Sequence, residues 1–103
     1  MRVIFVVTKM QISYDPAKRD ETLARRGLDL ADAGSVLCGP AMTVEDDRFD
    51  YGEPRFITIG LLNTRMVVVA WTPRGETYRI ISMRKANDRE IARYGPALRH
   101  HAG

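Results

Sequence analysis

Three stretches in the second half of the chain carry the strongest hydrophobic pattern. Residues 55–62, 65–72 and 77–84 are rich in β-branched and aromatic side chains, which is typical of β-strands. Connections of two and four residues join them, so neighbouring strands must be antiparallel. The run Met66–Trp71 is apolar at consecutive positions and therefore faces apolar surroundings on both sides. The pattern predicts an antiparallel meander with this strand at its centre.

Two helices are predicted before the meander. Residues 11–15 alternate as a short strand, after which Asp15 provides an N-cap and Pro16 suits the first helical turn. This helix should end at Gly27, and a second should run from Asp29 to Gly39-Pro40. The residues expected to face inward are Ala17, Leu23 and Ala24 in the first helix and Leu30, Ala33, Val36 and Leu37 in the second.

A third helix is predicted after the meander. Asn87 and Glu90 have the spacing of a capping box, and Gly95-Pro96 should end the helix, leaving residues 96–103 as a frayed tail. The polar segment 45–54 reads as a loop. Its acidic residues resemble a metal site only superficially, and a flexible surface loop is the preferred interpretation. The fold class is thus α+β: a small antiparallel sheet, two N-terminal helices on one face, a short C-terminal helix, and the other face open.

Composition limits the classes of protein that remain. A chain of 103 residues is expected to form a single domain, 1–103. The single Cys38 excludes an intramolecular disulfide, and one cysteine with two histidines near the C-terminus makes no metal site. The apolar run at residues 3–7 is shorter than the core of a signal peptide, of about 7–15 residues, so we expect a cytoplasmic protein without membrane contact. Residues 1–9 are interpreted as an N-terminal extension that would add a strand if folded.

Charge is distributed unevenly along the chain. Residues 1–52 contain seven Lys/Arg and nine Asp/Glu, a net charge of −2, whereas residues 53–103 contain nine and four, a net charge of +5. Five of these cations fall within residues 78–95. A basic half of this kind suits a polyanionic partner, although a solvated surface balanced by the acidic half is the simpler alternative.

Several motifs together resemble a known family. They are "YDPAK" (14–18), "RRG" (25–27), "RFITIG" (55–60) and "YRIISMRKANDRE" (78–90), followed by Tyr94. Residues 11–94 closely resemble the BrnT family of type II toxins. The resemblance implies a RelE-like fold, a ribonuclease activity that inhibits translation, and neutralisation by a BrnA-type ribbon-helix-helix antitoxin in a hetero-oligomer. The chain departs from the family pattern at Thr22 and at Arg25-Arg26, since many members have Asn and then Lys-His at these positions.

RNA cleavage without a metal or cofactor requires positive charge around the scissile phosphate. Arginine meets this need, because its guanidinium binds two phosphate oxygens and stays charged at any working pH. Arg79, Arg84 and Arg55 are therefore the leading candidates. Lys85 is a further candidate, either to neutralise charge or to donate a proton if neighbouring cations lower its pKa.

The proton-transfer groups are less obvious, because the only histidines are His100 and His101. Glu90 and Tyr94 lie four residues apart on one helical face and are candidates for this role. The cations expected to contact RNA are Lys18, Arg55, Arg89 and Arg93. Structural roles compete with these: Arg79 as the partner of a carboxylate across the sheet, Glu90 as a cap, Tyr94 and Trp71 as packing residues.

Strand alternation raises a difficulty for this site. Residues 79 and 84 have opposite parity, so Arg79 and Arg84 point to opposite faces unless the strand is bulged or ends before Arg84. We expect the strand to fray near Met83. The leading function is an RNA-cleaving toxin; the alternative is a non-catalytic module that binds nucleic acid or protein and retains the fold.

Overall fold

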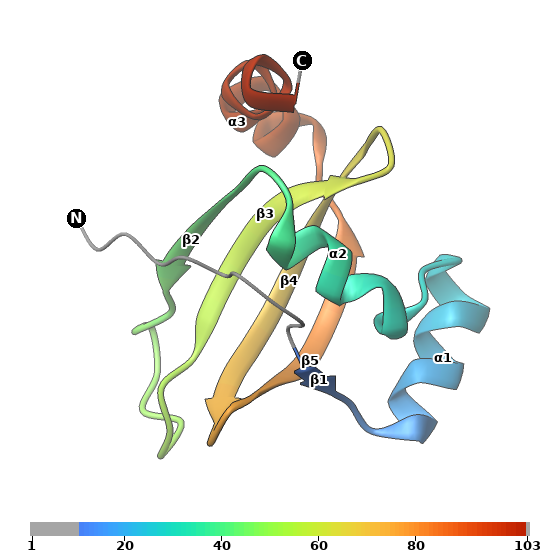
Figure 1. Cartoon of the computed structure of the whole chain (residues 1–103), viewed down its shortest axis with the longest axis vertical. Coiled ribbons are helices and arrows are strands. Elements are labelled where there is room, and N and C mark those ends of the chain that lie inside the picture. The colour runs from blue at the N-terminus through green and yellow to red at the C-terminus, as the bar shows by residue number, and fades with distance from the viewer. Residues whose placement is uncertain (1–10, 103) are drawn as a thin grey trace.

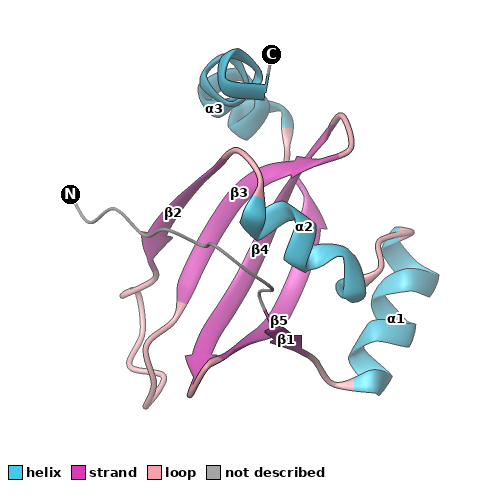
Figure 2. Ribbon diagram, in the orientation of Figure 1, coloured by secondary structure: helices cyan, strands magenta, loops and turns pink. Residues whose placement is uncertain are grey.

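A computed structural model describes residues 11–102, in which five strands and three helices form an α+β structure (Figure 1, Figure 2). The sheet has the order β1-β5-β4-β3-β2. The elements are β1 (Gln11–Ser13), α1 (Pro16–Arg26), the 3₁₀ turn η1 (Leu30–Asp32), α2 (Ala33–Cys38), β2 (Ala41–Glu45), β3 (Phe56–Leu62), β4 (Arg65–Arg74), β5 (Thr77–Lys85) and α3 (Asp88–Ala102). The extension expected at residues 1–9 lies outside the described residues.

The predicted meander of β3, β4 and β5 is confirmed, but the sheet is larger and not purely antiparallel. β1 pairs in parallel with the start of β5, because Gln11 lies opposite Thr77 and Ser13 opposite Arg79. β2 was missed; it pairs antiparallel with β3 along residues 41–45. Both additions form through contacts distant in sequence, which a short local pattern does not encode.

Helix α1 begins and ends as predicted. The Asp15 carboxylate accepts a hydrogen bond from the Ala17 N–H, and Gly27 ends the helix with a left-handed backbone (φ 68°). The predicted inward face is wrong: Thr22 is the buried residue, and Leu23 is 47% exposed. The reason is that α1 lies at the side of β5, where Arg26 donates a hydrogen bond to the Met83 carbonyl at 2.9 Å.

The main core lies between the sheet and the segment η1–α2. Leu30, Ala33 and Val36 are fully buried there, as predicted. They form one cluster with sheet residues Val67, Val69, Ile80 and Met83. We call this side the covered face of the sheet. α2 reaches β3 closely at Gly60, where an added Cβ would lie 2.8 Å from Val36 Cγ1.

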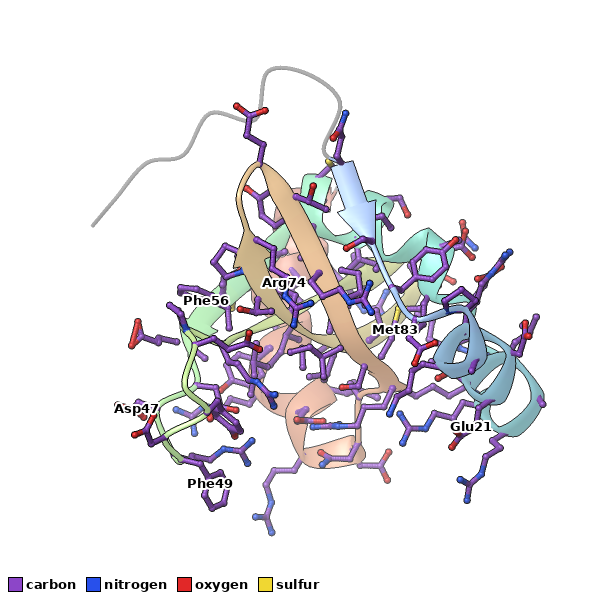
Figure 3. All side chains as sticks on the ribbon, turned by 90° about the horizontal axis from the view of Figure 1, so that it is seen from below. Glu21, Asp47, Phe49, Phe56, Arg74 and Met83 are labelled. Atoms are coloured by element: carbon purple, nitrogen blue, oxygen red, sulfur yellow. The ribbon has the colours of Figure 1, made fainter. Side chains whose placement is uncertain are left out.

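Helix α3 packs over Met66 on the opposite side of the sheet, so the face expected to be free is covered in part; we call this side the open face (Figure 3). Met66 directly precedes the core residue Val67 in β4, so its side chain points to the open face, where it approaches Gly95 of α3. The predicted end at Gly95-Pro96 is wrong, since α3 continues through both residues to Ala102 and the tail is helical. Burial of Leu98, which is 2% exposed, offsets the cost of a proline inside the helix. No helix within residues 11–102 is long and apolar enough to cross a membrane.

The predicted capping box at the start of α3 is confirmed. Asn87 accepts a hydrogen bond from the Glu90 N–H at 2.8 Å, and Glu90 accepts one from the Asn87 N–H at 2.9 Å. We expect Asn87→Ala to lower the free energy of unfolding by about 1 kcal/mol, because the first turn loses its side-chain acceptor. Urea unfolding checks this, and Asn87→Asp, which keeps an acceptor, is the control. Equal midpoints for the alanine variant and the wild type would contradict the prediction.

An ion pair fastens α1 to η1 and makes stability depend on pH. Arg19 donates to both carboxylate oxygens of Asp29, at 2.7 and 2.9 Å. These hydrogen bonds, with one from the Ala31 N–H, lower the pKa of Asp29 from 3.8 to about 2. A lowered folded-state pKa stabilises the fold above the unfolded value, and this stabilisation is lost as the pH falls from about 4 to about 2.

Asp29→Asn tests this contribution, since asparagine keeps the acceptor for Ala31 and loses the charge. We expect the variant to unfold at a lower temperature than the wild type at pH 7, with the gap closing near pH 2. Thermal unfolding followed by circular dichroism measures both. A gap that stays constant from pH 7 to pH 2 would assign the effect to something other than ionisation of Asp29.

Candidate functional site

A β-bulge in β5 decides where its arginines point. Ala70 of β4 lies opposite Ser82, but the next residue, Trp71, lies opposite Ile80, so Ile81 is an extra residue in β5. As a result Arg79 pairs with Thr72 and Arg84 with Val68, and Thr72 and Val68 share one face of β4. The two arginines therefore lie on the same, open face. The expectation that the strand frays near Met83 is wrong, because β5 continues to Lys85.

Four arginines gather on this open face. Arg74 is two residues after Thr72 in β4, so its side chain lies on the same face as Thr72 and therefore as Arg79 and Arg84. Arg55, just before β3, is connected through Glu53, whose carboxylate lies 3.6 Å from Arg55 and 3.5 Å from Arg74. We call Arg55, Arg74, Arg79 and Arg84 the arginine face. Arg74 was missed from the sequence because the strand was expected to end before Pro73.

Two of these arginines have unused hydrogen-bonding capacity. Arg79 is half-buried, and among residues 11–102 it makes no ion pair or side-chain hydrogen bond, so the expected pairing with a carboxylate is not observed. Nε of Arg55 is buried and makes no hydrogen bond within the described part of the chain; the Glu53 carboxylate lies 3.6 Å away, beyond hydrogen-bonding distance. The Arg55 guanidinium lies 4.0 Å from the centre of the Tyr51 ring. Buried polar groups normally find partners, so both positions favour binding of an anion.

Arg84 is held in place by Glu90. The guanidinium donates to both carboxylate oxygens, at 2.8 and 2.9 Å, while Glu90 also accepts the Asn87 N–H. The hydrogen bonds from Arg84, and to a smaller extent the one from the Asn87 N–H, lower the pKa of Glu90. The same bonds between Arg84 and Glu90 raise the pKa of Arg84. Glu90 is therefore ionised at neutral pH and its oxygens are engaged. The geometry fits a positioning role for Glu90 better than a role as a free base.

The other predicted site residues are dispersed. Lys85 lies opposite Val67 in the register and so starts from the covered face, away from Arg84. Arg89 and Arg93 are exposed on α3, with the Arg93 guanidinium 5.5 Å from the Tyr94 ring centre. Tyr94 is half-buried on the same helix. These roles stay predictions.

A second cationic region lies on α1. Lys18, Arg25 and Arg26, with Glu21 and Thr22, line a hollow of about 290 Å³. Arg26 donates a hydrogen bond to the Met83 carbonyl, and Arg25 pairs with Glu21 at 3.1 Å. Of the residues that line this hollow, the sequence predicted only Lys18 to contact RNA; the i, i+4, i+8 spacing of residues 18, 22 and 26 was the signal that Thr22 and Arg26 share its helical face.

The aromatic and acidic groups have structural roles. Trp71 packs against the core on the covered face, between Phe56 and Tyr78 at 4.8 Å from each ring centre, which confirms the packing interpretation. In the acidic loop, Asp46 binds Arg48 and Tyr51. No group of three or more His, Cys, Asp or Glu residues within the described chain is arranged to hold a metal ion.

The fold and charge distribution define a small α+β protein whose open sheet face is rich in arginine, as in proteins that bind polyanions. The family model for the ribonuclease toxin BrnT of type II toxin-antitoxin systems matches residues 14–90. The chain therefore belongs to the BrnT family of ribonuclease toxins. Membership implies an RNA substrate and an antitoxin partner. No curated protein matches the chain.

Proposed function

We propose that this chain is a RelE-like, metal-independent endoribonuclease that inhibits translation by cleaving RNA on the arginine face, and that a BrnA-type ribbon-helix-helix antitoxin neutralises it. One observation carries the proposal: the bulge at Ile81 brings Arg79, which has no acidic partner among the described residues, onto the same face as Arg84. A half-buried cation without a counter-charge is a suitable place for a scissile phosphate.

The reaction that fits this face is transesterification. The ribose 2′-oxygen attacks phosphorus, its proton passes to a base, the P–O5′ bond breaks, and an acid protonates the leaving 5′-oxygen. Arg79 stabilises the charge that develops on the phosphoryl oxygens, and Arg84, fixed by Glu90, supports the same group. Tyr94 is our candidate for proton transfer, because the carboxylate of Glu90 is already engaged. Lys18, Arg89 and Arg93 contribute to RNA affinity at the margins.

One observation favours the second candidate, a non-catalytic binding module. Arg26 stands where the family pattern has histidine, and its guanidinium is bound to the Met83 carbonyl. Arginine does not give up a proton at neutral pH, so any acid-base step at this position is lost. This module would bind RNA with a steep salt dependence and leave it intact.

Induced expression of the full chain distinguishes the two functions. The toxin should arrest growth and deplete intact mRNA, and both effects should disappear on co-expression of the cognate antitoxin and in the double variant Arg79→Ala, Arg84→Ala. Arg65→Ala, which removes an exposed arginine at the start of β4, is the matched control and should remain toxic. Normal growth with abundant folded wild-type protein would favour the binding module.

A further inference from the structure

An apolar strip lies beside the arginine face. Ile59 of β3 pairs with Val68, whose partner on β5 is Arg84, so Ile59 points to the open face. Met42 of β2 pairs with Ile59, and Val44 pairs with Ile57, which places all four on the same side. We call Met42, Val44, Ile57 and Ile59 the apolar strip. Met42 is 42% and Val44 62% exposed, unusually high for residues of their kind side by side on one strand.

The side-chain arrangement of β2 is inverted relative to an ordinary edge strand. A strand at the surface normally turns its apolar side chains to the core and its polar ones to water. In β2, Thr43 points to the side of the buried Thr58 and hydrogen-bonds its hydroxyl at 2.7 Å, whereas Met42 and Val44 point to the open face. Phe49, in the loop after β2, is 67% exposed and extends away from the body of the molecule (Figure 3). Exposed apolar groups gathered in this way mark a surface that a partner covers.

The charges next to the strip select the chemistry of that partner. A second copy docked face to face would bring two arginine faces together, which like charges oppose. RNA provides phosphates for the arginines but little that matches an aliphatic strip. A polypeptide with acidic residues on one side and apolar residues on the other matches both parts, and Arg79 is available for a carboxylate. Glu53 and Glu90 offset only part of the positive charge.

We propose that the arginine face and the apolar strip together bind an amphipathic, acidic segment of the antitoxin. This inference rests on the proposed function, which places RNA on the same face. The segment covers Arg79 and Arg84 when its apolar side lies on the strip, so antitoxin and RNA exclude one another. Neutralisation is then direct competition for the arginines, with the strip adding affinity that RNA does not obtain.

Calorimetric titration of the full-length chain with its cognate antitoxin tests the strip. Val44→Asp should weaken binding about 30-fold, because it removes an apolar contact and repels acidic residues. Leu23→Asp is the matched control: Leu23 is 47% exposed on α1, outside the strip, and this variant should bind as the wild type does. Circular dichroism of both variants checks folding, and Met42→Ser is a milder second variant of the strip.

The outcomes separate this inference from the proposed function. Unchanged antitoxin affinity in both strip variants, or an equal loss in Leu23→Asp, would overturn the inference whatever the enzymatic activity is. A chain that fails to cleave RNA but loses antitoxin binding on Val44→Asp would keep the docking surface and remove the ribonuclease. Light scattering of the chain alone measures its oligomeric state. A wild-type dimer that Val44→Asp dissociates would assign the strip to a second copy and contradict the inference.

Discussion

Arg79→Met is expected to reduce RNA cleavage by the purified chain by about 10²–10³-fold, the usual effect of removing one preorganised donor from a charged transition state. Methionine keeps an unbranched side chain of similar length, so the packing of the half-buried Arg79 stem on β5 is largely preserved. Cleavage of a labelled RNA under single-turnover conditions measures the effect.

The matched control is Arg65→Met, which removes an exposed arginine from the start of β4 outside the arginine face. It should cleave at the wild-type rate. If Arg79→Met keeps its melting temperature and also cleaves at nearly the wild-type rate, Arg79 does not contact the scissile phosphate. Equal losses in both arginine variants would indicate a general effect of net charge.

Gly60→Ala is expected to lower the free energy of unfolding by about 2–3 kcal/mol. The added Cβ would lie 2.8 Å from Val36 Cγ1, 3.2 Å from Ala41 Cβ and 3.3 Å from the Pro40 carbonyl oxygen. The Pro40 carbonyl and the Ala41 Cβ cannot rotate away, so β3 must move away from the segment 36–41, and the core around Val36 loosens. Denaturant unfolding monitored by the fluorescence of Trp71, the single tryptophan, provides the measurement.

Two further variants identify the clash as the cause. Gly34→Ala places its Cβ in ordinary contact with Ile12, at 3.8 Å, and should be neutral or stabilising by up to about 1 kcal/mol, since alanine is the better helix former. In a Val36→Ala background, Gly60→Ala should cost about 1 kcal/mol less than in the wild type, because the nearest neighbour is gone. A cost that is identical in both backgrounds would contradict the packing explanation.

Local signals predicted much of the fold. Asp15, Gly27 and the pair Asn87 and Glu90 act on the backbone within a few residues, and each forms the cap expected of it. The meander also follows from local pattern, because short turns leave only antiparallel pairing. The strand predicted at residues 11–15 is present as β1, but its parallel pairing with β5 was not foreseen. What failed depended on distant contacts: β2 needs β3 beside it, and α3 passes Pro96 because Leu98 is buried.

The candidate site shows the same division. Motifs within residues 78–90 identified Arg79 and Arg84, but period-two alternation placed them on opposite faces. The bulge at Ile81 that reunites them is a property of how β5 pairs with β4, and one strand read alone does not contain it. Arg74 escaped notice for a related reason. β4 continues past its last pair with β3, Phe56 with Trp71, and there pairs with β5 alone, so Pro73 lies at a sheet edge, where a proline is tolerated.

The nature of the RNA ends tests the central claim most directly. The purified chain is incubated with a defined RNA in excess EDTA, and the products are examined for their termini. We expect cleavage to persist without divalent metal, to leave 2′,3′-cyclic phosphate and 5′-hydroxyl ends, and to be lost in Arg79→Met. Cleavage that requires a divalent metal and leaves 5′-phosphates would contradict it, because the arginine face would then not be the group that stabilises the reaction.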